Sequence, residues 1–287
     1  MRASSNIDRS RVRGFTLIET LVVIAVVATL IALLLPSVQN SREMARRGQC
    51  QHRMGQIGLG LRAYAAFHQV LPPGVVNVGG PIRSVEDKSQ LHISWIAQIL
   101  PHIDRRNPFK KMDFSESVYS DRNLEIRNVW IPALTCSSFS NSNSDAGPCN
   151  FAGVHHHVEA PIDVDNTGVL FLNSSVHPDK IQDGRAHTMM VAEKESQADH
   201  LGWNSGTNST LRNTGYAIGT EFEYDRPEVP PETKDIRLIV GGFNSPHSNG
   251  YNALFADGHV MFLNMNIDQK VQQRMGHRSD GELIGNF

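Results

Sequence analysis

The sequence predicts an α+β protein in which one long N-terminal helix packs on an antiparallel β-sheet. Three observations predict this fold class. An apolar run without a charged residue covers residues 20–35, an amphipathic segment without proline covers 37–68, and short apolar runs separated by turn formers fill the rest. Long uninterrupted patterns are typical of helices, whereas short runs between turn-forming residues are typical of strands.

The apolar run is long enough to cross a membrane. Residues 15–35 would form a helix of about 31 Å, which matches the hydrocarbon core of a bilayer. The preceding charges are four arginines against one aspartate: Arg2, Arg9, Arg11, Arg13 and Asp8. The positive-inside rule then predicts a cytoplasmic N-terminus and an exported remainder. A cleaved secretory signal fits poorly. Its cleavage site would need small residues at the end of the apolar run, where this chain has Leu33, Leu34, Leu35 and Pro36.

A carboxylate lies about one turn inside this run. Glu19 would cost on the order of 2.5–3.5 kcal/mol in the membrane, so we expect it to have a partner. The residues from Gly14 to Glu19, Gly-Phe-Thr-Leu-Ile-Glu, resemble the class III signal of type IV prepilins and type II secretion pseudopilins. The alternative is a plain membrane anchor whose Glu19 reaches the interface or is protonated.

The resemblance to prepilins implies how the N-terminus is processed. A prepilin peptidase would cut between Gly14 and Phe15, and the new amine of Phe15 would be N-methylated. Glu19 would then pair with a terminal amine, either its own or that of a neighbouring pilin or pseudopilin subunit. The implied fold is pilin-like, with the first half of the helix in a membrane or filament and the second half against a globular head.

The helix is expected to continue beyond the membrane. Its second half has one apolar face, with spacings of three and four between Met54, Ile57, Leu61, Tyr64 and His68. Pro36 is expected to kink it, and the Pro-Pro-Gly sequence at 72–74 to end it. The predicted segments are a leader at 1–14, a transmembrane half-helix at 15–36, an amphipathic half-helix at 37–70 and a head at 71–287.

The head is predicted to be rich in β-strands. Short helices are expected at 91–100 and 121–128, and polar loops at 137–150 and 204–232. The expected strands are 131–135, 151–154, 169–172, 188–192, 238–240, 252–255 and 260–263.

A second motif lies near the C-terminus: His247, nine further residues, then Asp257-Gly258. Asp-Gly between two apolar runs predicts a hairpin with a type I′ turn, which needs positive φ at both central residues. The spacing resembles the C-terminal signature of a large bacterial family of unknown function whose members begin with prepilin-type signals. Cys50 and Glu193 also stand where that family's pattern expects them. His247 and Asp257 could alternatively form an acid–base pair, although bracing of the turn is favoured.

The three cysteines belong to the part of the chain that is expected to be exported. Cys136 and Cys149 would close a short polar loop and are the predicted disulfide, which leaves Cys50 on the helix.

Two weak metal sites are considered in the head. His155 and His157 would point to one face of a strand, and Asp163 and Asp165 carry the oxygen ligands that calcium prefers. Neither group has the spacing of a known zinc site or of an EF-hand. We therefore expect no cofactor, with calcium as the alternative.

The sequence favours a structural role over catalysis. No nucleophile and base can be named together, so an enzyme is not expected, and the net charge of −2 gives no reason to expect nucleic-acid binding. We expect a pseudopilin-like or type IV pilin-like subunit in the inner membrane, with its head in the periplasm or on the cell surface. The alternative is a membrane-tethered protein that binds a solute or carbohydrate.

Overall fold

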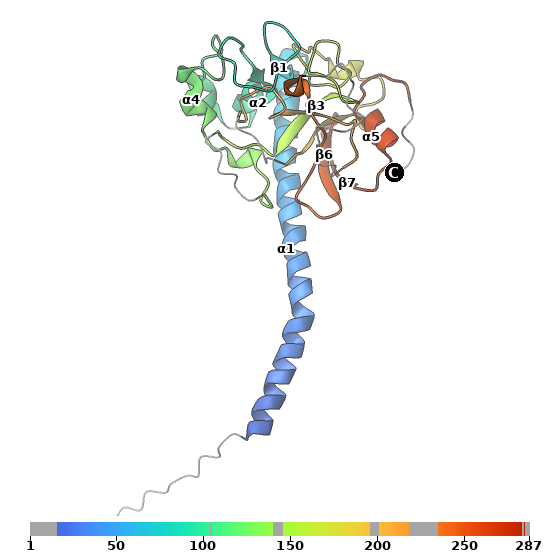
Figure 1. Cartoon of the computed structure of the whole chain (residues 1–287). Coiled ribbons are helices and arrows are strands. Elements are labelled where there is room, and N and C mark those ends of the chain that lie inside the picture. Colours follow the sequence, from blue (N-terminus) through green and yellow to red (C-terminus); the bar gives the residue numbers. More distant parts are fainter. Residues whose placement is uncertain are drawn as a thin grey trace, which may run out of the picture. The chain divides into compact units, whose positions relative to one another are not determined.

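The computed structural model describes residues 16–103, 105–139, 146–195, 201–218, 235–282 and 284. Gly14 and Phe15, the predicted processing site, lie outside these residues. The chain divides into two compact units, 1–45 and 46–287. Helix α1 (Leu17–His68) contributes its first part to one unit and its second part to the other (Figure 1).

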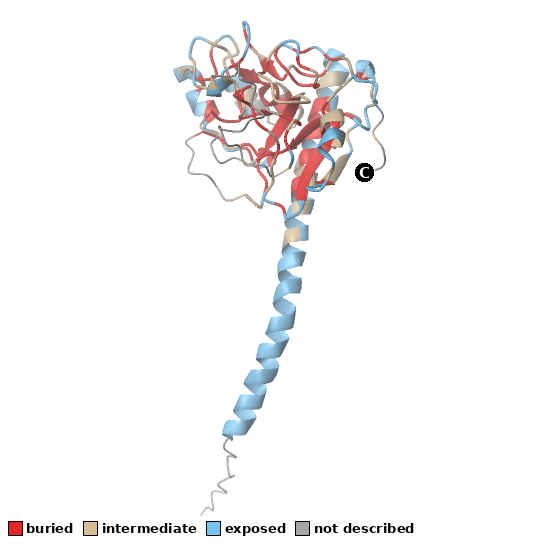
Figure 2. Cartoon of the chain, turned by 45° about the vertical axis from the view of Figure 1, so that its right-hand side comes forward, coloured by how far each residue is buried: buried red, intermediate tan, exposed pale blue. Residues whose placement is uncertain are grey.

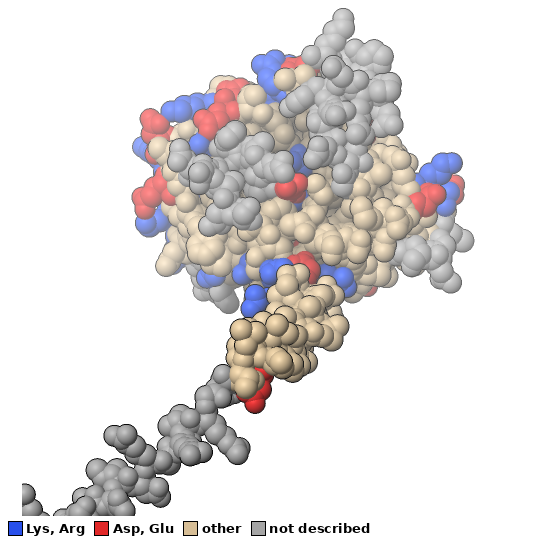
Figure 3. Space-filling view, turned by 60° about the horizontal axis from the view of Figure 1, so that its bottom comes forward, with Lys and Arg blue, Asp and Glu red and all other residues tan. Residues whose placement is uncertain are grey.

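The first unit contains an exposed apolar helix. Pro36 lies inside α1 and does not end it. The large apolar side chains of this part are exposed, with Leu17 at 81% and Leu33 at 70%, and Figure 2 shows it in pale blue. Glu19 is the one charged residue between 16 and 41, and in Figure 3 this part of the chain is almost entirely tan. By length and composition the helix can cross a membrane.

In the second unit, α1 is a core helix. Met54, Ile57 and Leu61 are fully buried and Tyr64 is partly buried, which confirms the predicted apolar face over these turns, whereas His68 at the end of the helix is exposed. Gly58 allows α1 to approach β6 (Gly250–Phe255) closely, because a Cβ atom there would lie 2.8 Å from Cδ1 of Leu254. The long helix therefore docks on the sheet through a stripe of apolar side chains and one glycine.

The main sheet has five strands in the order β5-β3-β4-β6-β7. Their bounds are Phe151–His156 for β3, Met189–Glu193 for β4, Leu211–Asn213 for β5, Gly250–Phe255 for β6 and Val260–Asn264 for β7. All neighbours are antiparallel except β3 and β5, which are parallel. A second, two-stranded sheet joins β1 (Val75–Val76) to β2 (Ile93–Ser94). The fold is α+β, as predicted.

Short helices fill the connections. The α-helices are α2 (Trp95–Ile99), α3 (Arg106–Lys111), α4 (Asp121–Arg127) and α5 (Gln269–Met275). The 3-10 helices are η1 (Leu100–His102), η2 (Pro132–Leu134), η3 (Pro178–Lys180) and η4 (Ile236–Leu238).

Three predicted strands are wrong. The segment 131–135 contains η2, because Pro132 lacks the N–H group that a strand would donate and fits the first turn of a helix. Residue 238 ends η4, and residues 239–240 follow it without joining the sheet. The run 169–172 is buried as expected, but it makes single backbone contacts, such as Leu170 N–H to the Val154 carbonyl at 3.1 Å, and no ladder. Apolar runs alone do not distinguish strands from buried loops.

The predicted hairpin forms between β6 and β7, but its turn type differs from the prediction. Within the turn, Gly258 has a positive φ of 98°, whereas Asp257 does not. The Phe255 amide donates to the His259 carbonyl at 3.0 Å, and the Gly258 amide donates to the Phe255 carbonyl at 2.9 Å. These bonds describe a three-residue connection with glycine in the left-handed region, which is the next commonest hairpin after the two-residue type I′ form.

Both faces of the sheet are covered. Alternate residues of β3 belong to different clusters: Phe151 packs with α1 and α2, whereas Ala152 and Val154 pack with Met275 of α5. This alternation is the period-two pattern of a strand buried on both sides. Figure 2 shows the resulting core in red.

Candidate functional site

The first candidate site is the start of α1, where Thr16 and Glu19 form a capping box. The amide and the hydroxyl of Thr16 donate to Oε2 of Glu19 at 2.8 and 2.9 Å, and the Glu19 amide donates to the Thr16 hydroxyl at 3.3 Å. Such reciprocal bonds satisfy helix-terminal N–H groups. Glu19 thus has a local role that the sequence interpretation missed, although the Thr-x-x-Glu spacing was a sufficient signal for it.

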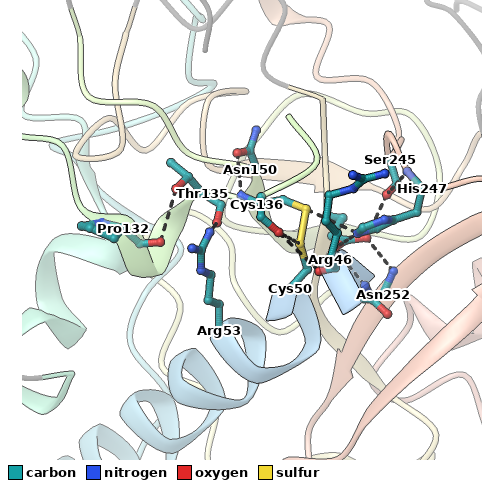
Figure 4. Close-up of a disulfide and its surroundings, with 12 residues drawn as sticks. Arg46, Cys50, Arg53, Pro132, Thr135, Cys136, Asn150, Ser245, His247 and Asn252 are labelled. Carbon is teal, nitrogen blue, oxygen red and sulfur yellow. Dashed lines mark hydrogen bonds and ion pairs between the residues drawn. A yellow bond between two sulfur atoms is a disulfide. The ribbon is translucent and has the colours of Figure 1, made fainter. Parts of the chain in front are cut away.

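The second candidate site is a buried cluster around a disulfide (Figure 4). The disulfide joins Cys50 of α1 to Cys136, which follows η2, with Cα atoms 5.3 Å apart. The predicted Cys136–Cys149 pair is therefore wrong. Cys149 is a buried cysteine outside the disulfide, and its Sγ donates to the carbonyl of Phe151 at 3.1 Å.

The pairing has a simple physical cause. Cys50 precedes Met54 by four residues, so it extends the buried face of α1 by one turn and points into the head. Both disulfide cysteines are buried, at 0% and 3% exposure. The asparagine side chain of Asn150 accepts from the Cys136 amide at 2.9 Å and fixes the second cysteine beside the helix.

A histidine and a carboxylate lie against this disulfide. Nε2 of His247 is 3.3 Å from Sγ of Cys136 and 3.4 Å from Oε1 of Glu193, and the two side chains are 1% and 0% exposed. His247 comes from the loop before β6, and Glu193 ends β4. Cys50, Cys136, Glu193 and His247 are all buried, and their sulfur, oxygen and nitrogen ligand atoms lie within 4.8 Å of one another.

The carboxylate of Glu193 is held by three donors. The Ser245 hydroxyl and the Asn252 amide donate to Oε2 at 2.9 and 2.8 Å, and the side-chain amide of Asn252 donates to Oε1 at 2.9 Å. Charge-assisted bonds of this kind fix a buried carboxylate in one orientation. These three donors hold the Glu193 carboxylate in one orientation beside His247.

His247 and Asp257 do not form an acid–base pair. They stand at opposite ends of β6, whose six residues span roughly 20 Å. The Asp257 carboxylate instead accepts from the amide of His259 at 3.0 Å and lies 2.7 Å from its Nδ1. Burial raises the pKa of Asp257, but the bonds from His259 outweigh it and leave the pKa below its ordinary value.

The predicted metal residues of the 155–165 region have separate partners. Nδ1 of His155 lies 3.0 Å from Oδ1 of Asn166, and Nδ1 of His157 lies 2.7 Å from the Thr167 hydroxyl. Asp163 accepts from the amide of the following residue at 2.8 Å. Within the described ranges, no group of metal-ligating atoms includes these two histidines, Asp163 or Asp165.

A further group of possible ligands was missed: Asp183, His277 and Asp280, in segments far apart in the sequence. Oδ1 and Oδ2 of Asp183 accept from the amides of residues 281 and 280 at 2.8 and 2.7 Å. Both carboxylate oxygens of Asp183 are thus occupied by backbone donors, which favours a structural role for this group over metal binding.

Comparison with known families agrees with both motifs. Residues 9–35 match the prokaryotic N-terminal methylation motif, and residues 39–270 match DUF1559, a family of proteins of unknown function. The chain belongs to this family. No curated protein and no solved structure matches it. As a prepilin-like DUF1559 protein, it carries a methylation motif that includes the first part of α1, a helix long and apolar enough to cross a membrane.

Proposed function

We propose that this DUF1559 protein is a pseudopilin-like or type IV pilin-like structural subunit, cut before Phe15, N-methylated there and docked through Glu19. One observation carries the proposal. The methylation motif includes the first part of α1, whose large apolar side chains between residues 17 and 38 are exposed in the described chain. Such a surface requires a membrane or a partner to cover it. The N-terminal arginines support a cytoplasmic leader and an exported head.

A structural role is further supported by the burial of the second site. His247 and Glu193 are almost completely inaccessible to solvent. A substrate would have to displace core residues to reach them, which disfavours catalysis there. The histidine and the carboxylate instead connect three segments of the head: the segment after η2, the end of β4 and residues 245–252.

The first test is the intact mass and N-terminal sequence of native protein from the membrane fraction. A chain that begins with N-methyl-Phe15 is the expected result. A chain that still begins at Met1 or Arg2 would contradict the proposal and favour a membrane-tethered solute-binding protein. The first place to test with sugars would then be a pocket of about 430 Å³ whose lining includes Arg62, Arg185 and Asp257.

A second test separates the two roles of Glu19. Glutamine also serves at this position of a capping box, so Glu19→Gln keeps the cap and removes the charge. We expect it to be processed but to lose co-assembly with pilin or pseudopilin subunits, as judged by crosslinking in membranes. Thr16→Ala is the matched control, since it removes the cap at a cost of about 1 kcal/mol and keeps the carboxylate. Unchanged co-assembly of Glu19→Gln would contradict docking by charge.

A further inference from the structure

We propose that Cys50, Cys136, His247 and Glu193 form a zinc site when the Cys50–Cys136 disulfide is reduced. The proposal is independent of the pilin-like function. It starts from the convergence of four ligand atoms, all buried, from α1, the segment after η2, β4 and the loop before β6. Two sulfurs, one imidazole nitrogen and one carboxylate oxygen are a ligand set that suits Zn²⁺ and does not suit calcium or magnesium.

The distances fit a tetrahedral ion. Zinc–ligand distances of about 2.0–2.3 Å place neighbouring ligands of a tetrahedral site about 3.3–3.8 Å apart. Nε2 of His247 lies 3.3 Å from Sγ of Cys136 and 3.4 Å from Oε1 of Glu193. The Cα atoms of the two cysteines are 5.3 Å apart, so their freed sulfurs can separate to this spacing by side-chain rotation. The imidazole nitrogen thus already lies at ligand–ligand spacing from one sulfur and from the carboxylate oxygen.

The surroundings orient these ligands. The hydroxyl of Ser245 and both nitrogens of Asn252 donate to the Glu193 carboxylate, and the Ser245 hydroxyl also accepts from the His247 amide at 3.2 Å; Figure 4 shows Ser245, His247 and Asn252 beside the disulfide. Donors of this kind around metal ligands typically contribute 10–100-fold to metal affinity. Asn150 similarly fixes the backbone of Cys136. These residues need no rearrangement when the ion binds.

Zinc binding requires two steps, reduction of the disulfide and coordination of the ion by both sulfurs. A thiol or phosphine reductant supplies two electrons, the S–S bond breaks, and two protons from the reductant or water convert both sulfurs to thiols. Zinc then binds both sulfurs as thiolates and releases these two protons. The ion offsets the charges of two thiolates and a carboxylate, which would be costly to bury without a cation. The disulfide and the ion are thus alternative cross-links between α1 and the head.

The test uses the full chain in detergent micelles. Protein is reduced with a phosphine, desalted under nitrogen, incubated with zinc chloride and analysed by native mass spectrometry. We expect one zinc per reduced chain and none in the oxidised chain. Cobalt in place of zinc should give the absorption of tetrahedral thiolate coordination. Less than half an equivalent of zinc in the reduced chain would overturn the proposal.

Variants distinguish this site from adventitious binding. His247→Ala and Glu193→Gln should each weaken zinc binding at least tenfold, whereas Cys149→Ser, which removes the buried thiol outside the cluster, should not change it. Circular dichroism monitors folding, and Asn252→Ala tests the surroundings without removing a ligand, with an expected loss of 10–100-fold. Unchanged affinity in His247→Ala, or loss of zinc in Cys149→Ser, would overturn the assignment.

Discussion

The two parts of α1 differ in where their apolar side chains lie, although the helix is continuous. Between 17 and 45 its apolar side chains are exposed, and the described chain offers nothing to cover them. From Cys50 to Leu61 the apolar face is fully buried in the head. The head, in turn, buries polar groups such as Glu193 and His155, each with named hydrogen-bond partners. The first unit therefore depends on its surroundings, and the second depends on its own core and cross-links.

The largest expected effect comes from removing the disulfide, which should destabilise the second unit alone. The double variant Cys50→Ala/Cys136→Ala opens a loop with a sequence separation of 86. In the chain-entropy account this costs about 4–5 kcal/mol of unfolding free energy. Urea unfolding of the full chain in detergent, followed by tryptophan fluorescence, measures it. Cys149→Ala is the control, because it removes a buried sulfur and no cross-link. Equal losses in both variants would contradict the cross-link's role.

A leucine-to-alanine pair on the same helix tests the comparison directly. Leu61 is fully buried and Leu34 is 60% exposed. Leu61→Ala should lower the unfolding free energy of the head by about 2–5 kcal/mol, because it leaves a cavity. Leu34→Ala should change it by less than about 0.5 kcal/mol. The same urea experiment measures both, and equal effects would mean that the first unit also contributes to folding of the head.

The parts of the fold that the sequence predicted are those with local signals. The apolar face through Met54 and Ile57 and the strands β3, β4, β6 and β7 follow from periodicity and turn residues. The Cys50 pairing also had such a signal, because Cys50 continues the helix periodicity. The short sequence separation of Cys136 and Cys149 favours the other pairing, but short separation is a weaker indication than a shared buried face.

The parts that could not be predicted depend on contacts between distant segments. Glu193 and His247 are separated in the sequence by β5 and η4, and nothing near either residue indicates the other. The parallel pairing of β3 with β5 likewise has no local sequence signature, because β5 has only three residues. The family resemblance placed Cys50, Glu193 and His247 in one sequence pattern but did not bring them together as a site, which only the three-dimensional contacts do.

The buried histidine His155 should make the unfolding free energy of the head depend on pH. Burial lowers the pKa of His155 from 6.5 to about 3, with smaller contributions from the charges of His156 and Arg212, although the Asn166 bond opposes the shift. Oδ1 of Asn166 can only accept, so Nδ1 of His155 carries the hydrogen. A proton added at Nε2 would be buried without a partner among the described residues.

This shift sets the sign of the pH dependence. Above pH 6.5 His155 is neutral in both states and has no effect. As the pH falls from 6.5 toward 3, the unfolded chain binds the proton first, so the unfolding free energy falls by about 1.4 kcal/mol per pH unit. Between pH 6.5 and 4.5, His155→Gln should therefore reduce the loss seen in the unmodified chain by about 2–3 kcal/mol.

Urea unfolding at pH 7, 5.5 and 4.5 measures this slope, and the difference between pH values is informative even if His155→Gln is less stable at every pH. His52→Gln is the matched control, because His52 is exposed on α1 and solvent reaches its ring in the folded and unfolded chain alike. His92 and His156, whose pKa values burial lowers to about 4, should keep part of the slope in both variants. An identical slope in His155→Gln and the unmodified chain would show that the head tolerates a charge at this position, as the exposed surface of α1 does.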